Sequence, residues 1–473
     1  MYKYLIRAEG GIILSKFHSN SGKEKILGIL KKQGAKIHFT GVGGVGMYSL
    51  FKLSHHLGYS VSGSDREGSA LTDELMTQGY DVKIGHSGEN VWDKDMLVYT
   101  LAAEEDNPEI ILAEKKGILA VSRAEYLGVL MQDYKERIGI SGSHGKSTTT
   151  AMLDRIFVEA KKAPTTLLGA RLEGRGSPLR VGSHSCMIYE ACEYKDSFLY
   201  FSPTVSVFTN LELDHVDYFK DIDAIKQSFL KAMNMPRLSV VNIDDENLRD
   251  LLPSVRVRAA TFGEGESADY QGVISKAKDG CYALKIRHGG KEIINVSLSV
   301  PGRFNARNAL AAAVTAYEIG VEAEYIERAL SRFHGIERRL EKIGEYGTAP
   351  VYYDYAHHPT EIECAIAGVK DMTGGDVVVI FKPHTYSRTA GLMNEFVKAL
   401  SLADRVLLTE ISAIREAAIE GVSSEVLARL IGDKAQFVND CDILKALEET
   451  KNSAIIIMGA ANLDEVKKRI IGK

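Results

Sequence analysis

The chain has 473 residues, a hydrophobic share of 45% and a formal net charge of −5 at pH 7. A length of this order is typical of about three domains, and the acidic balance excludes the global basic footprint of a nucleic-acid-binding protein. No apolar run approaches the roughly 20 residues of a membrane span, and the N-terminus has no long apolar core of a secretory signal. We therefore expect neither a nucleic-acid partner nor membrane insertion.

Five cysteines stand at positions 186, 192, 281, 364 and 441, and none belongs to a C-x-x-C pair. Zinc and thioredoxin-type chemistry are therefore not expected. The odd count, without a signal peptide, favours the reducing cytoplasm as the location. Residues 1–36 include a predicted short helix at Lys23–Gln33 and carry no recognisable chemistry, so they form an N-terminal extension of unknown role.

The first organised region joins a predicted strand at Ile37–Thr40, a glycine loop at Gly41–Gly46, a helix at Met47–Leu57 and a strand at Ser60–Asp65. This pattern, with an acidic residue about 20 residues after the loop, is typical of dinucleotide-binding folds. The loop then binds a pyrophosphate and the carboxylate a ribose. The candidate contacts are Gly41, Gly43, Gly44, Gly46, Ser64 and Asp65. NAD, FAD and a nucleotide-sugar all fit, and a glycine turn that only permits close packing is the alternative.

Further strands at Val82–His86, Met96–Thr100 and Leu119–Val121 alternate with helices such as Asn107–Lys116, which predicts a parallel sheet. This domain is expected to end near Lys135.

The strongest motif is Gly-x-x-Gly-Lys-Ser at residues 142–147, between a predicted strand at Arg137–Ile140 and a helix that continues from Ala151. Its glycines let backbone N–H groups approach phosphate oxygens, and the helix N-terminus adds positive charge. Lys146 can reach terminal phosphates and the Ser147 hydroxyl can ligate Mg²⁺. We predict a triphosphate site, with an ordinary glycine turn as the alternative. Its contacts are Gly142, Ser143, His144, Gly145, Lys146, Ser147 and Thr148.

Two later strands, Met187–Glu190 and Val205–Asn210, end in polar residues, and α/β folds place ligands at such strand ends. Glu190 is the expected Mg²⁺ partner of Ser147, and His215 is expected to ligate a second metal ion or contact the phosphoryl group. A surface charge at Glu190 and a hydrogen-bonded loop histidine at position 215 are the alternatives.

Short strands and the hairpin signals Asp279-Gly280 and Gly289-Gly290 predict a small β excursion at Val255–Val300 on the central domain. A helix is predicted at Ala309–Ile319. Strands at Val377–Phe381, Arg405–Leu408 and Ala454–Met458 then predict a third α/β domain.

Nine ordered motifs together resemble the Mur ligase family. They are Gly41–Gly46, Ser62–Asp65, Gly142–Thr150, Glu190–Leu199, Thr209–His215, Pro301–Ala312, Arg338–Arg339, Tyr355–Glu361 and Pro383–Thr389. The resemblance implies an α/β fold of three domains: a Rossmann-like N-terminal domain, a P-loop central domain and a Rossmann-like C-terminal domain. The boundaries are 37–135 for the UDP-sugar, 136–337 for ATP and 338–473 for the amino acid.

The resemblance also implies the reaction: a cytoplasmic ligase of peptidoglycan precursor synthesis that uses ATP and Mg²⁺ and acts as a monomer or homodimer. The carboxylate of UDP-N-acetylmuramate takes the γ-phosphate of ATP, and the amine of L-alanine displaces phosphate from the acyl phosphate. The motifs add Asn210, Asn305 and Arg338 to the cofactor contacts. The chain departs from the family pattern at Phe304, where a histidine is common, and at Thr385, where an arginine is frequent.

His357 and Arg388 are predicted to form the amino-acid end of the site, because an α-amino acid carries a carboxylate that arginine holds bidentately. Arg388 follows one strand, and His357 follows the preceding strand, so adjacency of sequential strands places their loops together. The alternative is that Arg388 caps a helix and His357 is a packed turn residue.

Three other functions remain open from the residues. A related ligase could attach a recycled murein peptide to the same nucleotide-sugar. An NAD-dependent oxidoreductase could use the first glycine loop, although hydride transfer has no use for a second triphosphate loop. A degenerate binding homologue is disfavoured by the intact Lys146, Ser147 and Glu190.

Overall fold

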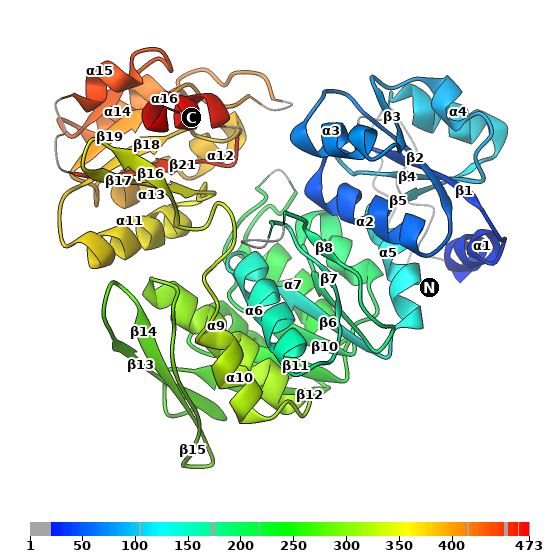
Figure 1. Ribbon diagram of the computed structural model, residues 1–473, viewed down its shortest axis with the longest axis horizontal. Coiled ribbons are helices and arrows are strands. Elements are labelled where there is room, and N and C mark those ends of the chain that lie inside the picture. The colour runs from blue at the N-terminus through cyan, green and yellow to red at the C-terminus, as the bar shows by residue number, and fades with distance from the viewer. Residues whose placement is uncertain are drawn as a thin grey trace. The chain divides into compact units, whose positions relative to one another are not determined.

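A computed structural model describes residues 20–103, 106–171, 176–216, 218–413, 416–448, 453–461 and 463–472. The chain divides into two compact units, Met1–Asp133 and Tyr134–Lys473 (Figure 1). The expected N-terminal extension lies outside the described residues up to position 19, and its predicted helix is α1 (Asn20–Leu30). The finer domain boundaries near residues 135 and 337 stay predictions. Within the described ranges, no helix is both long and apolar enough to cross a membrane.

The first unit is built on a parallel sheet, as predicted. Its described strands lie in the order β3 (Asp81–Ile84), β2 (Ser60–Asp65), β1 (Lys36–Thr40), β4 (Met96–Tyr99) and β5 (Leu119–Ser122). The helices of this unit are α2 (Val45–His56), α3 (Ala70–Thr77), α4 (Pro108–Lys116) and α5 (Arg123–Leu130), with short 3₁₀ turns at Gly88–Val91 and Met131–Asp133. Strand β1 pairs with both β2 and β4, so the strand order reverses at the first glycine loop. Such a switch point is where open α/β sheets bind ligands.

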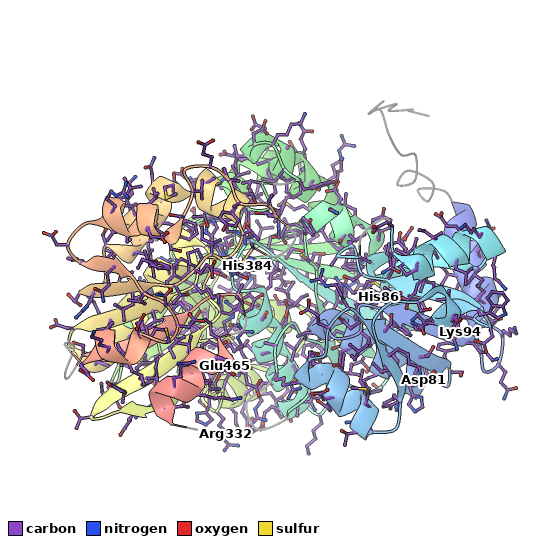
Figure 2. All side chains as sticks on the ribbon, turned by 90° about the horizontal axis from the view of Figure 1, so that it is seen from above. Asp81, His86, Lys94, Arg332, His384 and Glu465 are labelled. Atoms are coloured by element: carbon purple, nitrogen blue, oxygen red, sulfur yellow. The ribbon has the colours of Figure 1, made fainter. Side chains whose placement is uncertain are left out.

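A buried polar cluster, which we call the Glu109 cluster, lies between the sheet and α4 in this unit. The Glu109 side chain is fully buried, and its carboxylate accepts hydrogen bonds from Ser64 (2.8 Å) and Asn90 (2.7 Å). Its oxygens also lie 3.5 Å from ring nitrogens of both His38 and His86, and His86 is labelled in Figure 2. Burial opposes the charged carboxylate, but the hydrogen bonds with His38 and His86 outweigh it and lower the pKa of Glu109. The hydrogen bond to Glu109 in turn raises the pKa of His86.

The second unit begins with a long sheet whose centre carries the P-loop. Strand β6 (Glu136–Ser141) lies between β10 (Val205–Phe208) and β9 (Cys186–Glu190), parallel to both. The described order is completed by β7 (Thr165–Leu167) and β8 (Leu179–Arg180) beyond β9, and by β11 (Leu238–Asn242), β12 (Arg258–Gly263), β13 (Tyr270–Lys276), β14 (Tyr282–His288) and β15 (Lys291–Ser297) beyond β10. The P-loop therefore leaves the sheet at another strand-order switch point.

The predicted β excursion is confirmed as strands β13 to β15, which are antiparallel to one another and extend the central sheet. Each hairpin turns through two residues with positive φ, Asp279-Gly280 in the first and Gly289-Gly290 in the second. This is the backbone that two-residue hairpin turns require, and it explains why the dipeptides are good sequence signals.

The helices of the central part include α6 (Lys146–Glu159), α7 (Ile222–Met233), α8 (Glu246–Leu251), α9 (Arg303–Glu318) and α10 (Ala323–Leu330), with 3₁₀ turns at Tyr194–Tyr200 and Leu252–Ser254. Helix α9 packs beside α6 (Figure 1). Its buried face is rich in alanine, from Ala306 through Ala309 to Ala313, and such small side chains let two helices approach closely. This contact brings the N-terminus of α9 to the P-loop.

The last part of the chain forms a second sheet of the same unit. Its described strands lie in the order β16 (Glu341–Tyr346), β17 (Ala349–Asp354), β21 (Ala454–Met458), β18 (Val377–Phe381), β19 (Arg405–Leu408) and β20 (Ala435–Phe437), and β16 alone among them pairs antiparallel. The helices are α11 (Pro359–Thr373), α12 (Tyr386–Gly391), α13 (Met393–Leu400), α14 (Ser424–Ile431), α15 (Ile443–Leu447) and α16 (Asp464–Ile471).

The expected adjacency of sequential strands is wrong in this sheet, because β21 lies between β17 and β18. Every residue of β21 is buried, and a strand this apolar gains most free energy in the middle of a sheet covered on both faces. The predicted α/β fold with parallel strands is confirmed in both units.

The Glu109 cluster predicts a bell-shaped pH dependence of stability in the first unit. We expect Glu109→Gln to cost about 3 kcal/mol of unfolding free energy, because it removes the charge that pairs buried groups. The lowered pKa of Glu109 means that its carboxylate stabilises the folded state above pH 4.5, and this stabilisation is lost as the pH falls. The raised pKa of His86 means that its imidazolium stabilises the folded state below pH 6.5, and this stabilisation is lost as the pH rises. Chemical denaturation of the full chain should show the largest deficit between pH 4.5 and 6.5.

The exposed Glu114→Gln on the same helix is the control and should unfold like the wild type. A deficit that does not change with pH would contradict the assigned charge of the cluster.

Candidate functional site

The P-loop connects β6 to α6 through two glycines with positive φ, Gly142 (+143°) and Gly145 (+82°). A Cβ atom at Gly142 would collide with Thr209, and one at Gly145 would collide with the amide of Asn308. The loop is held from outside by Asn210, whose Oδ1 accepts from the His144 amide at 2.8 Å and whose Nδ2 donates to the His144 carbonyl at 3.0 Å. The loop is therefore a close-fitting cradle that suits a triphosphate.

Lys146 and Glu193 form a buried ion pair beneath this loop. The Lys146 ammonium lies 3.2 Å from both Glu193 carboxylate oxygens, donates to the carbonyls of Gly142 and Ser143, and is 16% exposed, whereas the Glu193 side chain is fully buried. Burial lowers the pKa of Lys146, but the charge of Glu193 outweighs it and raises the pKa overall. The lysine thus stays charged where a phosphate needs a cation.

His215 completes this charged group. Its Nε2 lies 3.8 Å from Glu193 and 3.9 Å from Asp214, and burial lowers its pKa despite both carboxylates. A neutral imidazole is the form that ligates metal ions. Glu190, at the end of β9, accepts a hydrogen bond from the Gly169 amide. By residue type, the Ser147 hydroxyl and the carboxylates of Glu190 and Glu193 offer the oxygen ligands that Mg²⁺ prefers. The metal-binding roles of Ser147, Glu190 and His215 stay predictions.

Glu193 is a residue that the sequence analysis missed. It lies three positions after Glu190, and the sequence spacing of the two glutamates does not show which carboxylate pairs with Lys146. The 3₁₀ turn that follows decides this, since Lys195 and Asp196 have positive φ and bend the chain there.

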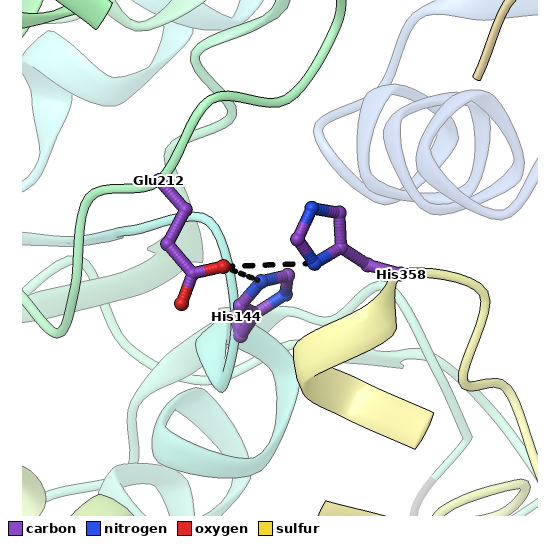
Figure 3. A group of neighbouring side chains, drawn as sticks. All are labelled: His144, Glu212 and His358. Carbon is purple, nitrogen blue, oxygen red and sulfur yellow. Dashed lines mark hydrogen bonds and ion pairs between the residues drawn. The ribbon is translucent and has the colours of Figure 1, made fainter. Parts of the chain in front are cut away.

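A second polar group joins the central sheet to the C-terminal sheet within the same unit. His144 Nε2 lies 3.3 Å from Glu212 Oε2, and His144 Nδ1 lies 3.3 Å from Glu361 Oε1. Burial opposes a charge on His144, but Glu212 and Glu361 raise its pKa to about 9. His358 also faces Glu212, and burial lowers its pKa to about 4 (Figure 3). None of Glu212, His358 or Glu361 was predicted as a site residue.

A cavity of about 310 Å³ opens beside this group. Its lining comes from both parts of the second unit and includes His144, Thr148, Asn210, Asn308, Arg339 and Asp354. Asn305, a predicted cofactor contact, donates through its Nδ2 to the carbonyl of Pro301 at the start of α9, and its cofactor role stays a prediction. Its neighbour Asn308 faces the P-loop at Gly145.

Of the paired arginines, Arg339 lines the cavity and lies 3.5 Å from Glu361. Arg338, the predicted cofactor contact, donates to the carbonyls of Gly459 and Ala461 and stacks 4.6 Å from the centre of the Tyr355 ring. Its side chain thus connects the loop after β21 to the loop after β17. Its role as a cofactor contact stays a prediction.

The two residues predicted at the amino-acid end are brought together, although their strands are not adjacent. Arg388 donates to Asp214 at 2.8 Å, and another of its nitrogens lies 3.3 Å from His384, which is labelled in Figure 2. The rings of His357 and His384 lie 6.1 Å apart. Arg388 Nε is buried and has no hydrogen-bond partner among the described residues. A donor in this state is suited to an incoming carboxylate.

Asp214 and Thr385 hold Arg388 in place. Burial opposes a charge on Asp214, but Arg388 outweighs it and lowers the pKa of this carboxyl. The Thr385 hydroxyl accepts a hydrogen bond from the backbone N–H of Arg388 and caps α12, so the N-cap of this helix is Thr385 and not Arg388. Its φ of +69° is unusual for a β-branched residue, and such backbone strain concentrates at functional sites.

In the first unit, the glycine loop after β1 is shaped by Asp65. The Asp65 carboxylate accepts from the Gly43 amide at 2.8 Å, and Gly41 has a φ of +86°. A Cβ atom at Gly43 would lie 2.9 Å from both Asp65 Oδ2 and Ser69 Oγ. Ser64 belongs to the Glu109 cluster, so its hydroxyl is directed to Glu109. The substrate roles of Gly41, Gly43, Gly44, Gly46, Ser64 and Asp65 stay predictions.

Family models match most of the chain. Residues 36–135 match "Mur ligase family, catalytic domain", residues 140–316 match "Mur ligase middle domain", and residues 338–461 match "Mur ligase, glutamate ligase domain".

Curated proteins and solved structures are similar over nearly the full length. A UDP-N-acetylmuramate–L-alanine ligase of Caldicellulosiruptor bescii is 40% identical, covering 93% of this chain and 98% of its own. One of Clostridium tetani is 36% identical, covering 90% and 96%. The crystal structure of a UDP-N-acetylmuramate–alanine ligase of Thermotoga maritima aligns with a TM-score of 0.79 at 28% identity, covering 92% and 98%. A murein peptide ligase of Psychrobacter arcticus shares the fold, with a TM-score of 0.70 at 24% identity over 93% and 98%.

Proposed function

This chain belongs to the Mur ligase family, and we propose that it joins the carboxylate of UDP-N-acetylmuramate to the amine of L-alanine at the expense of ATP, in peptidoglycan precursor synthesis. The observation that carries the proposal is the P-loop of Gly142–Ser147 with Lys146 held by the buried Glu193. A chain that also has a separate glycine loop in its first unit fits a reaction between ATP and a nucleotide-linked acid. Relatives at 36–40% identity carry the name of this ligase and support the choice of substrates.

In the first step, a carboxylate oxygen of the sugar nucleotide attacks the γ-phosphorus of ATP, the bond to the β-phosphate oxygen breaks, and an acyl phosphate and ADP form. Lys146 and the N-terminus of α6 stabilise the charge on the transferred group. Ser147, Glu190, Glu193 and His215 would hold Mg²⁺, which when bound offsets charge on the phosphoryl oxygens.

In the second step, the neutral amine of alanine attacks the acyl carbon, phosphate leaves with the bonding electron pair, and the proton that the nitrogen loses passes to water, which leaves the amide. In this proposal the Nε of Arg388, which has no hydrogen-bond partner among the described residues, binds the alanine carboxylate. His384 lies between the two predicted residues, 3.3 Å from an Arg388 nitrogen and with its ring 6.1 Å from that of His357, which supports a shared subsite. Holding the amine in position beside the acyl carbon lowers the entropic cost of the reaction, which is the main advantage of such a subsite.

The peptide-adding reaction of a murein peptide ligase is the second candidate, because the solved structure of that name from Psychrobacter arcticus shares this fold at 24% identity. Release of ADP in the presence of UDP-N-acetylmuramate, with L-alanine, other amino acids and a murein tripeptide as separate acceptors, tests the choice. Turnover with the tripeptide alone would replace alanine as the proposed acceptor. The cytoplasmic location and the monomeric or dimeric state remain our predictions.

Lys146→Ala should lower kcat for ADP release on the order of 100-fold or more, because a cation at the transferred phosphoryl group is lost. The exposed Lys162→Ala, just beyond the same helix, should keep wild-type turnover. Since Lys146→Ala leaves Glu193 buried without its partner, thermal unfolding of this variant checks that lost activity does not follow from lost folding. Wild-type turnover in Lys146→Ala would remove the P-loop assignment.

Gly43→Val should raise the KM for UDP-N-acetylmuramate about tenfold or more, because the added side chain displaces Asp65 and blocks approach to the loop backbone. The KM for ATP should not change. Gly68→Ala, whose added carbon meets open space in the same unit, is the control. A raised KM for ATP with an unchanged sugar KM would mean that the two loops are wrongly assigned.

Arg388→Lys keeps the positive charge beside Asp214 but loses the fork of donors, so the KM for alanine should rise about tenfold while that for ATP stays constant. The exposed Arg429→Lys serves as the matched control. An unchanged alanine KM would exclude Arg388 from the amino-acid site.

A further inference from the structure

We propose that His144, Glu212 and His358 form a binding site for a divalent transition-metal ion of the Zn²⁺ class, separate from the proposed Mg²⁺ ligands. This inference goes beyond the proposed function, because it rests on side chains that the ligase chemistry above does not use as metal ligands. The three residues come from the P-loop, from the segment after β10 and from the start of α11, all within the second unit.

The spacing of the candidate ligand atoms is that of a small metal site. One ligand atom from each residue lies within 4.8 Å of the others. Glu212 Oε2 lies 3.3 Å from His144 Nε2 and 3.6 Å from His358 Nδ1. Around a tetrahedral Zn²⁺ with bonds of about 2.0–2.1 Å, neighbouring ligand atoms are about 3.3–3.4 Å apart. Figure 3 shows both imidazole rings directed at the same carboxylate oxygen.

His358 supplies an independent reason to expect a ligand. Its side chain is only 6% exposed, and among the described residues neither of its ring nitrogens has a hydrogen-bond partner. Buried polar atoms are nearly always paired, since an unpaired one has lost its hydration without compensation. A metal bond at Nδ1, the nitrogen that faces Glu212, would provide the missing partner.

The surroundings of the cluster match those of histidine–metal sites. Glu361 lies behind His144, with its Oε1 3.3 Å from Nδ1, the ring nitrogen that does not face Glu212. Nδ1 has no hydrogen-bond partner among the described residues, so Glu361 acts on this ring through its charge, and Nε2, which faces Glu212, is the nitrogen that would bind the ion. The Thr360 hydroxyl donates to Glu212 at 2.7 Å and fixes that carboxylate.

The ligand types select the class of ion. Two imidazoles with one carboxylate suit Zn²⁺, Co²⁺ or Ni²⁺, whereas Mg²⁺ prefers oxygen ligands in an octahedral arrangement. Three protein ligands leave one position for water or a phosphate oxygen. Because the sequence has no C-x-x-C pair, we did not expect a zinc site. That expectation concerns cysteine ligands alone and does not apply to histidines from segments that are distant in the sequence.

The test is titration of the chelator-treated, dialysed full-length chain with Zn²⁺ by calorimetry, and with Co²⁺ by visible absorption, without ATP and with Mg²⁺ in excess. We expect one equivalent of Zn²⁺ to bind and Co²⁺ to give the intense absorption of a tetrahedral site. His358→Gln and Glu212→Gln should each weaken binding at least tenfold, because loss of one of three ligands leaves an incomplete site.

His334→Gln, which removes an exposed histidine, should bind like the wild type. Thermal unfolding of each variant without metal checks that the fold is intact. The proposal is overturned if the wild type binds no Zn²⁺, if His358→Gln and Glu212→Gln bind it undiminished, or if His215→Gln abolishes binding, which would place the ion at the proposed Mg²⁺ site. Since no substrate is present, these outcomes do not depend on the ligase proposal.

Discussion

The need to keep a buried lysine charged governs the second unit. Lys146 starts a helix beneath a loop of backbone donors, and its ammonium is stable there because Glu193, itself fully buried, neutralises it. Glu193 in turn requires a chain reversal through residues with positive φ, and it lies near the neutral His215. In the proposed reaction, the lysine that Glu193 keeps charged would stabilise the negative charge of the transferred phosphoryl group.

Paired charges and polar hydrogen bonds also connect the two sheets of this unit. Asp214, after β10, pairs with Arg388, after β18, and Thr360, at the start of α11, donates to Glu212. Each contact joins a charged group at the carboxyl end of a parallel strand to a polar group from the other sheet. Asp214 and Arg388 are only 9% and 11% exposed, so each charge needs the other, and the contact fixes Arg388, the predicted amino-acid contact, relative to the segment after β10.

Much of the fold could be predicted from local patterns. The strands Val377–Phe381, Arg405–Leu408 and Ala454–Met458 have the predicted bounds, because apolar runs between turn residues are strong strand signals. Ser60–Asp65 also has the predicted bounds, although it is mostly polar; the β–glycine loop–α–β pattern identified it. The place of β21 between β17 and β18 could not be predicted, because β18 is as apolar as β21 and apolar composition alone does not order two such strands. Glu193, Asn308 and Glu361 were missed because their partners are distant in the chain.

The sequence by itself determined the family, the α/β class, the two glycine loops and the residue types available for chemistry, because loops, caps and apolar periodicity are local properties of a chain. Only the tertiary structure decided which carboxylate pairs with Lys146, which arginine of Arg338–Arg339 lines the cavity, and that His144 and His358 share Glu212. These choices depend on desolvation and on distances of a few ångströms between segments far apart in sequence, and neither quantity exists until the chain has folded.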